Sequence, residues 1–573
     1  MNRRNFVEWL GLAGGALATD GISFFRDGKN MPEGERFMEK RKELSDDVVI
    51  AGAGIGGFAA AMAALRNGHT VILTEETDWI GGQFTQQGLS CPDEHPWIET
   101  HGATQLYRDF RTAIRGYYRK NYPLTDAARA KKNLNPGEGL VAALCFEPKV
   151  ALAVFYNFLA PYFSSGKLHL FLQHRIVGAD VNGDRVKTLK ARHNLTGNDI
   201  LLTAPYFIDA TELGDLLPLT GTEYVTGSES KNHTKELHAA EVANPKNQQA
   251  FNFCFAMDFL EGENHTIHKP ARYDFWKNFI PNLSPPWPGK LLQMAYSNPS
   301  TLQPKTLGFD PRGTPTGKAL NLWNYRRIID KQNFKPGTFD SDITIINWPQ
   351  NDFFLGNIAD VNKEELTQNL DAAKQLSLSL LYWLQTEVPR ADGGMGWPGL
   401  RLRPDVMGTI DGLAKYPYIR EARRIRAVFT ILEEHVGEAN RVLVAGKERG
   451  KKAADFFDSV GVGYYHIDLH PTTAGNNYID FNSLPFQIPM GALLPQRMKN
   501  LLAASKNIGT THITNGCYRL HPVEWSIGEA AGMLVSFALK NKISPHEIRE
   551  QQTSLSDFQN LTRSQGLETH WPG

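Results

Sequence analysis

The 573-residue sequence has only four cysteines, and no two of them stand in a CxxC pair. This absence argues against a zinc site or a thioredoxin-like redox motif, so we predict no metal centre. A disulfide stays open at this stage, although most of the cysteines are expected to be buried as small apolar side chains. The four are Cys91, Cys145, Cys254 and Cys517.

The sequence also lacks an excess of either charge, because 61 Lys and Arg residues balance 61 Asp and Glu residues. A chain without an excess of positive charge lacks the electrostatic attraction to phosphates that nucleic-acid-binding proteins use, so a nucleic-acid partner is not expected. The length exceeds what a single hydrophobic core usually supports, which predicts two or more regions with a cleft between them.

Near the N-terminus the apolar run of residues 9–18 is too short to cross a bilayer, so no permanent membrane span is predicted. Arg3 and Arg4 precede this run, and together they resemble a twin-arginine export signal, which predicts a periplasmic or otherwise exported protein. The alternative is a disordered basic start without function. Residues 20–44 are polar and predict a linker, with folding starting near Asp46.

A strand, a glycine turn, a helix and a second strand follow in that order over residues 47–74. The turn matches GxGxxG: its first glycine permits a tight turn, its second lets the backbone approach a pyrophosphate, and its third allows close helix packing. The phosphates would lie at the helix N-terminus. A glycine turn without a nucleotide is the alternative. The turn consists of Gly52, Ala53, Gly54, Ile55, Gly56 and Gly57.

Glu75 ends the second strand, 23 residues after the first glycine of the turn, and is followed by Glu76. This spacing is close to that of the carboxylate that accepts hydrogen bonds from the adenosine ribose in dinucleotide-binding folds. The pattern predicts a dinucleotide but does not separate FAD from NAD.

Three further segments resemble flavoproteins of the glutathione-reductase-like superfamily. A glycine pair follows the ribose acid, a D-A-T segment follows at residues 209–211, and a C-terminal segment spans residues 500–532. A plain loop is the alternative for the glycine pair. The relatives place an aspartate on the flavin ribityl chain, where this sequence has Ser505 and Asn507, so contacts there stay open. The resemblance and the strand at 176–181 imply cofactor contacts from Gly81, Gly82, Gln83, Thr85, Ile176, Val177, Asp209, Ala210, Thr211, Ser505, Asn507, Gly528 and Ala531.

Together these segments resemble a bacterial family of FAD-dependent oxidoreductases, often described as xanthan-lyase-like, over most of residues 46–545. The resemblance implies FAD as cofactor and an α/β fold: a Rossmann-like FAD-binding domain of glutathione-reductase type with an inserted α+β substrate domain. The predicted organisation is an export signal and linker (1–44), the first part of the FAD-binding domain (45–225), a substrate or cap region (226–489), the second part of the FAD-binding domain (490–545) and a tail (546–573).

Short strands are predicted at residues 168–172, 176–181, 186–191 and 200–208, with a tight hairpin turn at Asn182-Gly183. Helices are predicted at residues 363–385 and 523–540. The region 215–490 is rich in Trp, Tyr and Pro, which suits either stacking on a sugar or an aromatic core.

Flavin oxidation of a C–H bond usually needs a base for the adjacent proton, and histidine suits that role near neutral pH. His512 is the favoured base, with His521 and Arg519 completing the predicted catalytic set. For His470 we consider three roles: a metal ligand, a substrate contact, or a structural hydrogen bond with Asp468. Covalent attachment of the flavin through Cys91 or His95 is left open.

The cluster Arg420, Glu421, Arg423 and Arg424 suits either an anionic substrate group or an ion-paired helix face. We therefore expect an exported enzyme that dehydrogenates a polar small molecule, such as a sugar derivative, hydroxy acid or amine, and passes electrons to an acceptor that the sequence does not specify. The alternatives are a flavin-dependent reductase of an unsaturated substrate and a non-catalytic flavin-binding protein.

Overall fold

Five short parallel strands join the two ends of the chain in one sheet. The computed structural model describes residues 42–314 and 317–572. The strand order is β21 (Leu501–Ala503), β8 (Tyr206–Asp209), β2 (Val48–Ala51), β3 (Val71–Glu75) and β4 (Leu168–Leu172). Strands β2 and β3 are buried along their whole length, as expected for apolar parallel strands covered on both faces. The predicted α/β fold class with a parallel sheet is confirmed.

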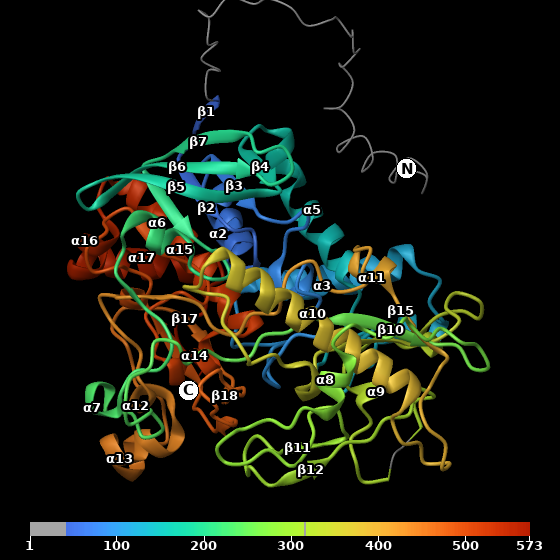
Figure 1. Ribbon diagram of the computed structural model, residues 1–573. Helices are drawn as coiled ribbons and strands as arrows, with labels where there is room; N and C mark the ends of the chain where they lie inside the picture. The colour runs from blue at the N-terminus through green and yellow to red at the C-terminus, as the bar shows by residue number, and fades with distance from the viewer. Residues whose placement is uncertain (1–41, 315–316, 573) are drawn as a thin grey trace, which may run out of the picture. The chain divides into compact units, whose positions relative to one another are not determined.

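Helices α2 (Ile55–Arg66) and α15 (His521–Asn541) lie against each other, so early and late parts of the chain pack side by side (Figure 1). Small residues permit this close approach. A Cβ atom added at Gly528 would lie 2.0 Å from the carbonyl oxygen of Gly56, and one added at Gly532 would lie 2.2 Å from that of Ala60. These glycines therefore hold the C-terminal helix against the helix that follows the glycine turn.

A second sheet has the order β1 (Lys42–Ser45), β7 (Asp199–Thr203), β6 (Arg185–His193) and β5 (His174–Asn182). Its hairpin is confirmed, but Asn182 pairs with Arg185, which places the turn one residue later than predicted. The single strand predicted over residues 200–208 was wrong: the chain leaves β7 before Pro205 and continues as β8 in the central sheet. A proline cannot donate to a ladder, which explains the break.

Strand β1 was missed by the sequence analysis, which assigned residues 42–44 to a linker. It pairs in parallel with β7 at the edge of the second sheet. Its residues KELS show no apolar run, and an edge strand needs none, because half of its surroundings are water.

An antiparallel third sheet lies in the middle of the chain, in the order β13 (Arg327–Ile329), β14 (Ile343–Ile346), β10 (Phe255–Phe259) and β15 (Leu400–Leu402). The long helix α10 (Lys363–Thr386) begins where the Asn362 side chain accepts a hydrogen bond from the Glu365 amide. A second hydrophobic core includes Trp276, Trp323 and Trp383, so much of the aromatic content of this region is core. The domain boundaries stay a prediction.

Short elements complete the described part of the chain. The remaining helices are α3 (Gln105–Asn121), α4 (Asp126–Ala130), α5 (Pro148–Ser164), α6 (Leu216–Thr220), α7 (Lys231–Thr234), α8 (Tyr273–Asn278), α9 (Leu322–Tyr325), α11 (Pro404–Met407), α12 (Glu433–Val436), α13 (Glu438–Arg449), α14 (His512–Tyr518), α16 (Pro545–Glu550) and α17 (Gln552–Ser564). Paired short strands are β9 (Tyr224–Val225) with β16 (Arg424–Ile425), β11 (Ala295–Ser297) with β12 (Pro304–Thr306), β17 (Ser459–Gly463) with β20 (Phe486–Pro489), and β18 (Ile467–Leu469) with β19 (Ile479–Phe481).

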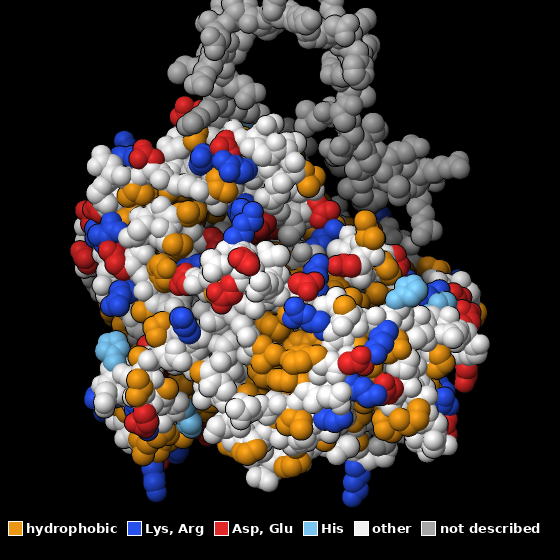
Figure 2. Space-filling view, in the orientation of Figure 1, with side chains coloured by type: hydrophobic (Ala, Val, Ile, Leu, Met, Phe, Trp, Pro, Cys, Tyr) orange, Lys and Arg blue, Asp and Glu red, His pale blue; other side chains and the backbone are white. Residues whose placement is uncertain are grey.

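Figure 2 shows basic and acidic side chains interspersed over the visible face of the described residues, in keeping with the balanced charge. Within residues 42–314 and 317–572, no helix is long and apolar enough to cross a membrane. The predicted twin-arginine signal lies outside the described residues. All four cysteines are buried free thiols, which confirms their predicted role as small core side chains.

Candidate cofactor site and its polar surroundings

The glycine turn joins β2 to α2 at the carboxyl end of the central sheet. Gly52 has φ +89°, and a Cβ atom there would lie 2.4 Å from the carbonyl oxygen of Ala210. A Cβ atom at Gly57 would lie 1.9 Å from the carbonyl oxygen of Gly52, so this glycine lets the helix pack on its own turn. The side chain of Glu212 lies over the turn, since its Oε1 would be 2.6 Å from a Cβ atom at Gly54.

Glu75 ends β3 beside this turn and is 4% exposed. Its carboxylate accepts hydrogen bonds from the Ala53 amide at 3.0 Å and the Thr77 amide at 2.9 Å. Burial raises the pKa of Glu75 to about 8. Burial, with the nearby carboxylate of Asp215, also raises the pKa of Glu76 to about 7. The carboxylate of Glu75 is thus fixed at the end of β3, the position at which the sequence predicts a contact with the ribose.

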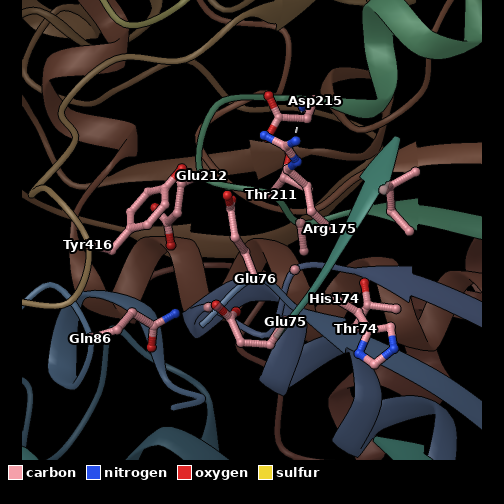
Figure 3. A pocket seen from close by; sticks show the side chains of 14 residues that line it. Thr74, Glu75, Glu76, Gln86, His174, Arg175, Thr211, Glu212, Asp215 and Tyr416 are labelled. Atoms are coloured by element: carbon pink, nitrogen blue, oxygen red, sulfur yellow. Dashed lines mark hydrogen bonds between the residues drawn. The ribbon is translucent and has the colours of Figure 1, made fainter. Parts of the chain in front are cut away.

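A narrow cavity of about 40 Å³ opens beside the turn, and Figure 3 shows side chains from β3, β5 and the loop after β8 converging on it. The lining residues that the sequence predicted are Gly52, Gly54, Glu75, Glu76, Ile176, Ala210 and Thr211. Those it missed are Thr74, Gln86, His174, Arg175, Glu212, Asp215 and Tyr416. Glu212 and Asp215 follow directly after the recognised D-A-T segment and could have been found from it, whereas Tyr416 has no local signal.

The ionisation of Glu75 gives a pH-dependent prediction. A carboxyl whose pKa is raised in the folded chain binds more protons than in the unfolded chain, so the folded state loses stability as pH rises from about 4.5 to 8. In flavin-free protein, Glu75→Gln should reduce the slope of the free energy of unfolding against pH by about 1 kcal/mol per pH unit between pH 5.5 and 7.5. Urea denaturation at these two pH values measures it. Equal slopes in the two proteins would show that Glu75 is ionised when folded.

The glycine pair of the predicted flavin loop lies next to the first turn. The Gly81 amide donates to the carbonyl of Ala53 at 2.8 Å, and the Gly82 amide donates to Oε1 of Gln86 at 2.9 Å. Thr85 is buried and donates to the carbonyl of Ile80 at 2.6 Å. The two glycine segments therefore form one continuous backbone surface.

Gln83 links this loop to the C-terminal segment. Its Nε2 donates to Oε2 of Glu524 at 2.7 Å and to the carbonyl of Arg519 at 3.2 Å. Ser505 donates to the other carboxylate oxygen of Glu524 at 3.0 Å. Lys506 is fully buried and ion-paired with Glu212 and with Glu524, the latter at 3.3 Å. Burial alone would lower the pKa of Lys506, but the two carboxylates raise it above its ordinary value.

Other predicted contact residues hold the loops in place. Asp209 accepts hydrogen bonds from the Thr211 and Leu216 amides, and Asn507 donates to the Asp209 carbonyl at 3.0 Å. Gly528 lies at the crossing of α2 and α15. Val177 lines an adjoining groove, not the cavity itself. Ala531 is buried on α15. A direct cofactor contact from any of these residues stays a prediction.

His521 is the first residue of α15 and is fully buried. Its Nδ1 accepts a hydrogen bond from the Asp93 amide at 3.1 Å, so the neutral ring carries its proton on Nε2. This Nε2 has no hydrogen-bond partner among the described residues. Burial lowers the pKa of His521 to about 4, so at neutral pH the side chain is an N–H donor and not a base.

A buried group of alternating charges, here called the polar cluster, lies around the segment that precedes α15. Arg519 pairs with Asp468 at 3.0 Å, Arg420 pairs with Asp352 at 3.0 Å, and Arg326 pairs with Asp93 at 3.4 Å. His470 lies between two of the carboxylates. The polar cluster consists of Asp93, Arg326, Asp352, Arg420, Asp468, His470 and Arg519.

Within the polar cluster, His470 Nδ1 contacts Asp352 Oδ2 at 2.5 Å and Nε2 lies 3.5 Å from Asp468 Oδ2. The predicted pair with Asp468 is thus the weaker of its two contacts. Three arginine Nε–H groups of the cluster have no acceptor among the described residues, nor do the Nε2 amides of Gln87 and Gln249 next to it. Gln249 contacts the cluster because its Oε1 accepts from the His470 amide at 3.3 Å.

His512, the favoured base, lies elsewhere. Its Nδ1 contacts Glu421 Oε1 at 2.9 Å, and its ring lines a second cavity that shares no lining residue with the first. The arginines near residue 420 do not lie on a helix, contrary to one of the two interpretations. Each is buried and paired: Arg423 with Asp215 and Asp360, and Arg424 with Glu229 and Glu421.

The residues between the glycine turn and α15 fit the predicted cofactor. Three buried polar atoms along this path lack a partner within the described parts of the chain: Glu212 Oε1, Gln83 Oε1 and His521 Nε2. Buried polar atoms are rarely left unsatisfied, so such a row indicates a ligand with its own donors and acceptors. The carboxylate beside the glycine turn and the open N-terminus of α2 suit a ribose and a pyrophosphate.

Comparison with solved structures finds flavoproteins of low sequence similarity. A variant of E. coli quinol fumarate reductase FrdA is 11% identical, with 91% of this chain and 74% of that chain covered and a TM-score of 0.31. The anhydrotetracycline hydroxylase OxyS from Streptomyces rimosus is 10% identical, with 91% and 69% covered and a TM-score of 0.33.

Among curated proteins, squalene epoxidase 5 from Arabidopsis thaliana is 32% identical over 111 residues. That match covers 17% of this chain and 22% of the relative, so the chain spans less than a quarter of the curated relative it matches. The pattern of the family described as FAD dependent oxidoreductase matches residues 47–561. The chain therefore belongs to the FAD-dependent oxidoreductase family, and FAD is its cofactor.

Proposed function

We propose that this flavoenzyme dehydrogenates a polar small molecule, such as a sugar derivative, a hydroxy acid or an amine. The observation that carries the proposal is the polar cluster, in which buried N–H groups of three arginines have no acceptor among the described residues. An apolar ligand would leave these donors unsatisfied, at a cost of about 1–3 kcal/mol each. Hydroxyl or carboxylate oxygens of a substrate would satisfy them.

FAD would be held by the two glycine segments, by Glu75 and by the loop that carries Lys506. When bound, the flavin supplies an acceptor for a hydride from a substrate C–H bond. The chain's own task is to bind the substrate, exclude water and take up the proton of the adjacent O–H or N–H group.

His470 is the residue best arranged to take that proton. Asp352, which is 1% exposed, fixes Nδ1 of the ring, and a buried carboxylate behind a histidine both orients it and stabilises its charged form. Arg519 connects the cluster to the predicted flavin loop, because it pairs with Asp468 while its carbonyl accepts from Gln83. His512 remains a second candidate base, since Glu421 supports it in the same way.

His521 and Arg519 are proposed to bind, not to exchange protons. The neutral His521 ring offers a single buried N–H group at the start of α15. The guanidinium of Arg519 keeps its charge and offers a further unpaired N–H. Export through the twin-arginine route is also proposed, on Arg3 and Arg4 alone.

Anaerobic reduction of the bound flavin tests the proposal. The enzyme with its FAD should lose its 450 nm absorbance with at least one compound from a panel of sugars, hydroxy acids and amines. His470→Asn should slow this reduction by about 100-fold or more and leave the flavin content unchanged. His268→Asn is the matched control, because His268 is exposed.

The outcomes separate the competing functions. Flavin that no panel compound reduces, but that passes electrons from a reduced dye to an unsaturated substrate, would replace the proposal by a reductase. Flavin that neither gives nor takes electrons with any compound would indicate a non-catalytic protein. Equal reduction rates in His470→Asn and wild type, with a slow His512→Asn variant, would move the base to His512.

A further inference from the structure

A second cavity lies beside α14, away from the predicted cofactor cavity. Its volume is about 80 Å³, which suits several water molecules or one small organic ion. None of its lining residues lines the first cavity. The lining includes four polar side chains, Glu236, Asn247, His238 and His512, and the apolar side chains of Ile479 and Ile513.

Two buried acceptor atoms on the cavity wall have no donor in the described part of the chain. Glu236 is 1% exposed, and its Oε1 accepts from the Glu433 amide at 2.9 Å and the Thr511 hydroxyl at 2.6 Å, whereas Oε2 has no partner. Asn247 is 4% exposed. Its Nδ2 donates to Ser228 and Asn476, whereas Oδ1 has no partner. A ligand here is therefore expected to be a hydrogen-bond donor.

The charges around the cavity favour a cation. Glu229 accepts from the Arg424 guanidinium and the His512 amide, His238 pairs with Glu433 at 2.8 Å, and His512 pairs with Glu421 at 2.9 Å. Together with Glu236 this makes four carboxylates against one guanidinium. Burial raises the pKa of Glu236 to about 7, and a nearby positive ligand would favour its charged form. A buried acidic group of this kind gains most from a positive ligand.

The geometry excludes a metal ion as the favoured cation. No group of three or more His, Cys, Asp or Glu side chains is placed to ligate a metal within residues 42–314 and 317–572. The lining also includes the apolar side chains of Ile479 and Ile513. A ligand with N–H donors at one end and carbon at the other matches both kinds of side chain.

We infer that this cavity binds a small primary alkylammonium ion. Its N–H groups would donate to Glu236 Oε2 and Asn247 Oδ1, while its carbon chain contacts Ile479 and Ile513. The site is distinct from the proposed polar cluster, and the inference does not depend on which substrate the flavin oxidises.

Calorimetric titration of the FAD-loaded enzyme with ethylammonium chloride tests the inference. Saturable binding of ethylammonium is expected, with none for ethanol, which lacks the charge, and none for tetramethylammonium, which lacks N–H donors. Glu236→Gln should weaken binding by about tenfold or more, because a hydrogen bond to a charged acceptor becomes one to a neutral acceptor.

The control is Glu241→Gln, since the Glu241 side chain is 84% exposed and is absent from the cavity wall; it should bind like wild type. An absence of saturable binding would mean that the cavity holds water only and would overturn the inference. So would an equal response to tetramethylammonium, or a Glu236→Gln variant that binds as tightly as wild type. All readouts are binding readouts, so a failed flavin-reduction assay leaves them unaffected.

Discussion

Lys506→Met should destabilise the folded chain by about 3–5 kcal/mol at pH 7, the range observed when one partner of a buried ion pair is removed. Lys506 is fully buried and pairs with Glu212 and Glu524, which are also buried. Without the ammonium group, both carboxylates stay buried with no counter-charge from Lys506. Urea denaturation followed by tryptophan fluorescence measures the loss.

The same variant should show a characteristic pH dependence. Burial already raises the pKa of Glu524, and Lys506 opposes this rise. In Lys506→Met the pKa rises further, so the folded chain binds more protons than the unfolded chain, and stability falls as pH increases above about 4.5. The loss of stability in Lys506→Met relative to wild type should therefore be smaller at pH 5 than at pH 7.

Two further variants make the lysine test decisive. Lys540→Met, on the exposed end of α15, should change stability by less than about 0.5 kcal/mol. The triple variant Lys506→Met, Glu212→Gln, Glu524→Gln removes the uncompensated charges and should recover much of the loss. An equal deficit at pH 5 and pH 7 would show that lost packing, and not buried charge, is the cause.

Gly52→Ala should lower the amount of FAD that copurifies with the chain by at least about tenfold, equivalent to about 1.4 kcal/mol of binding free energy. The added Cβ atom would lie 2.4 Å from the carbonyl oxygen of Ala210, and Gly52 itself has φ +89°. The turn must move to relieve this contact, and the helix N-terminus that should bind the pyrophosphate moves with it. The ratio of absorbance at 450 and 280 nm after purification measures flavin content.

Gly68→Ala is the matched control for this prediction. Gly68 has φ +94°, close to that of Gly52, but a Cβ atom there would meet nothing within 4 Å. Both variants should lose about 1–2 kcal/mol of stability from the left-handed backbone. Only Gly52→Ala should also lose flavin. Equal flavin content in the two variants would remove the glycine turn from the cofactor site.

The parts of the fold that were predicted correctly are those that depend on residues near one another in the sequence. The glycine turn, Glu75 and the hairpin after β5 each depend on residues close together in the chain, so spacing alone identifies them. Strand β1 and the break at Pro205 were missed because one is a polar edge strand and the other is a change of sheet inside one apolar run. Neither leaves a periodic signal.

The polar cluster could not be predicted because its members meet only through space. Asp352 and His470 are 118 residues apart, and no local spacing links them. The arginines near residue 420 were noticed, but whether they face a substrate or a carboxylate depends on Asp352, Asp215 and Glu229, which the sequence does not place beside them. His512 likewise belongs to the C-terminal segment that resembles a flavin-binding segment. Its ring nevertheless contacts Glu421 and lines the second cavity, not the first.

The position of β21 has a consequence for how the protein is made. This strand supplies the edge of the central sheet next to β8, but it leaves the ribosome about 450 residues after the glycine turn. At ordinary rates of synthesis this interval is roughly 20 to 90 s. For about the last 290 residues of this interval, after β8 has been made, the growing polypeptide carries an unpaired edge on β8, and throughout the interval helix α2 lacks the surface of α15. The nucleotide-binding fold can therefore close only after translation is nearly finished, and until then the edge of β8 is open to pairing with other chains.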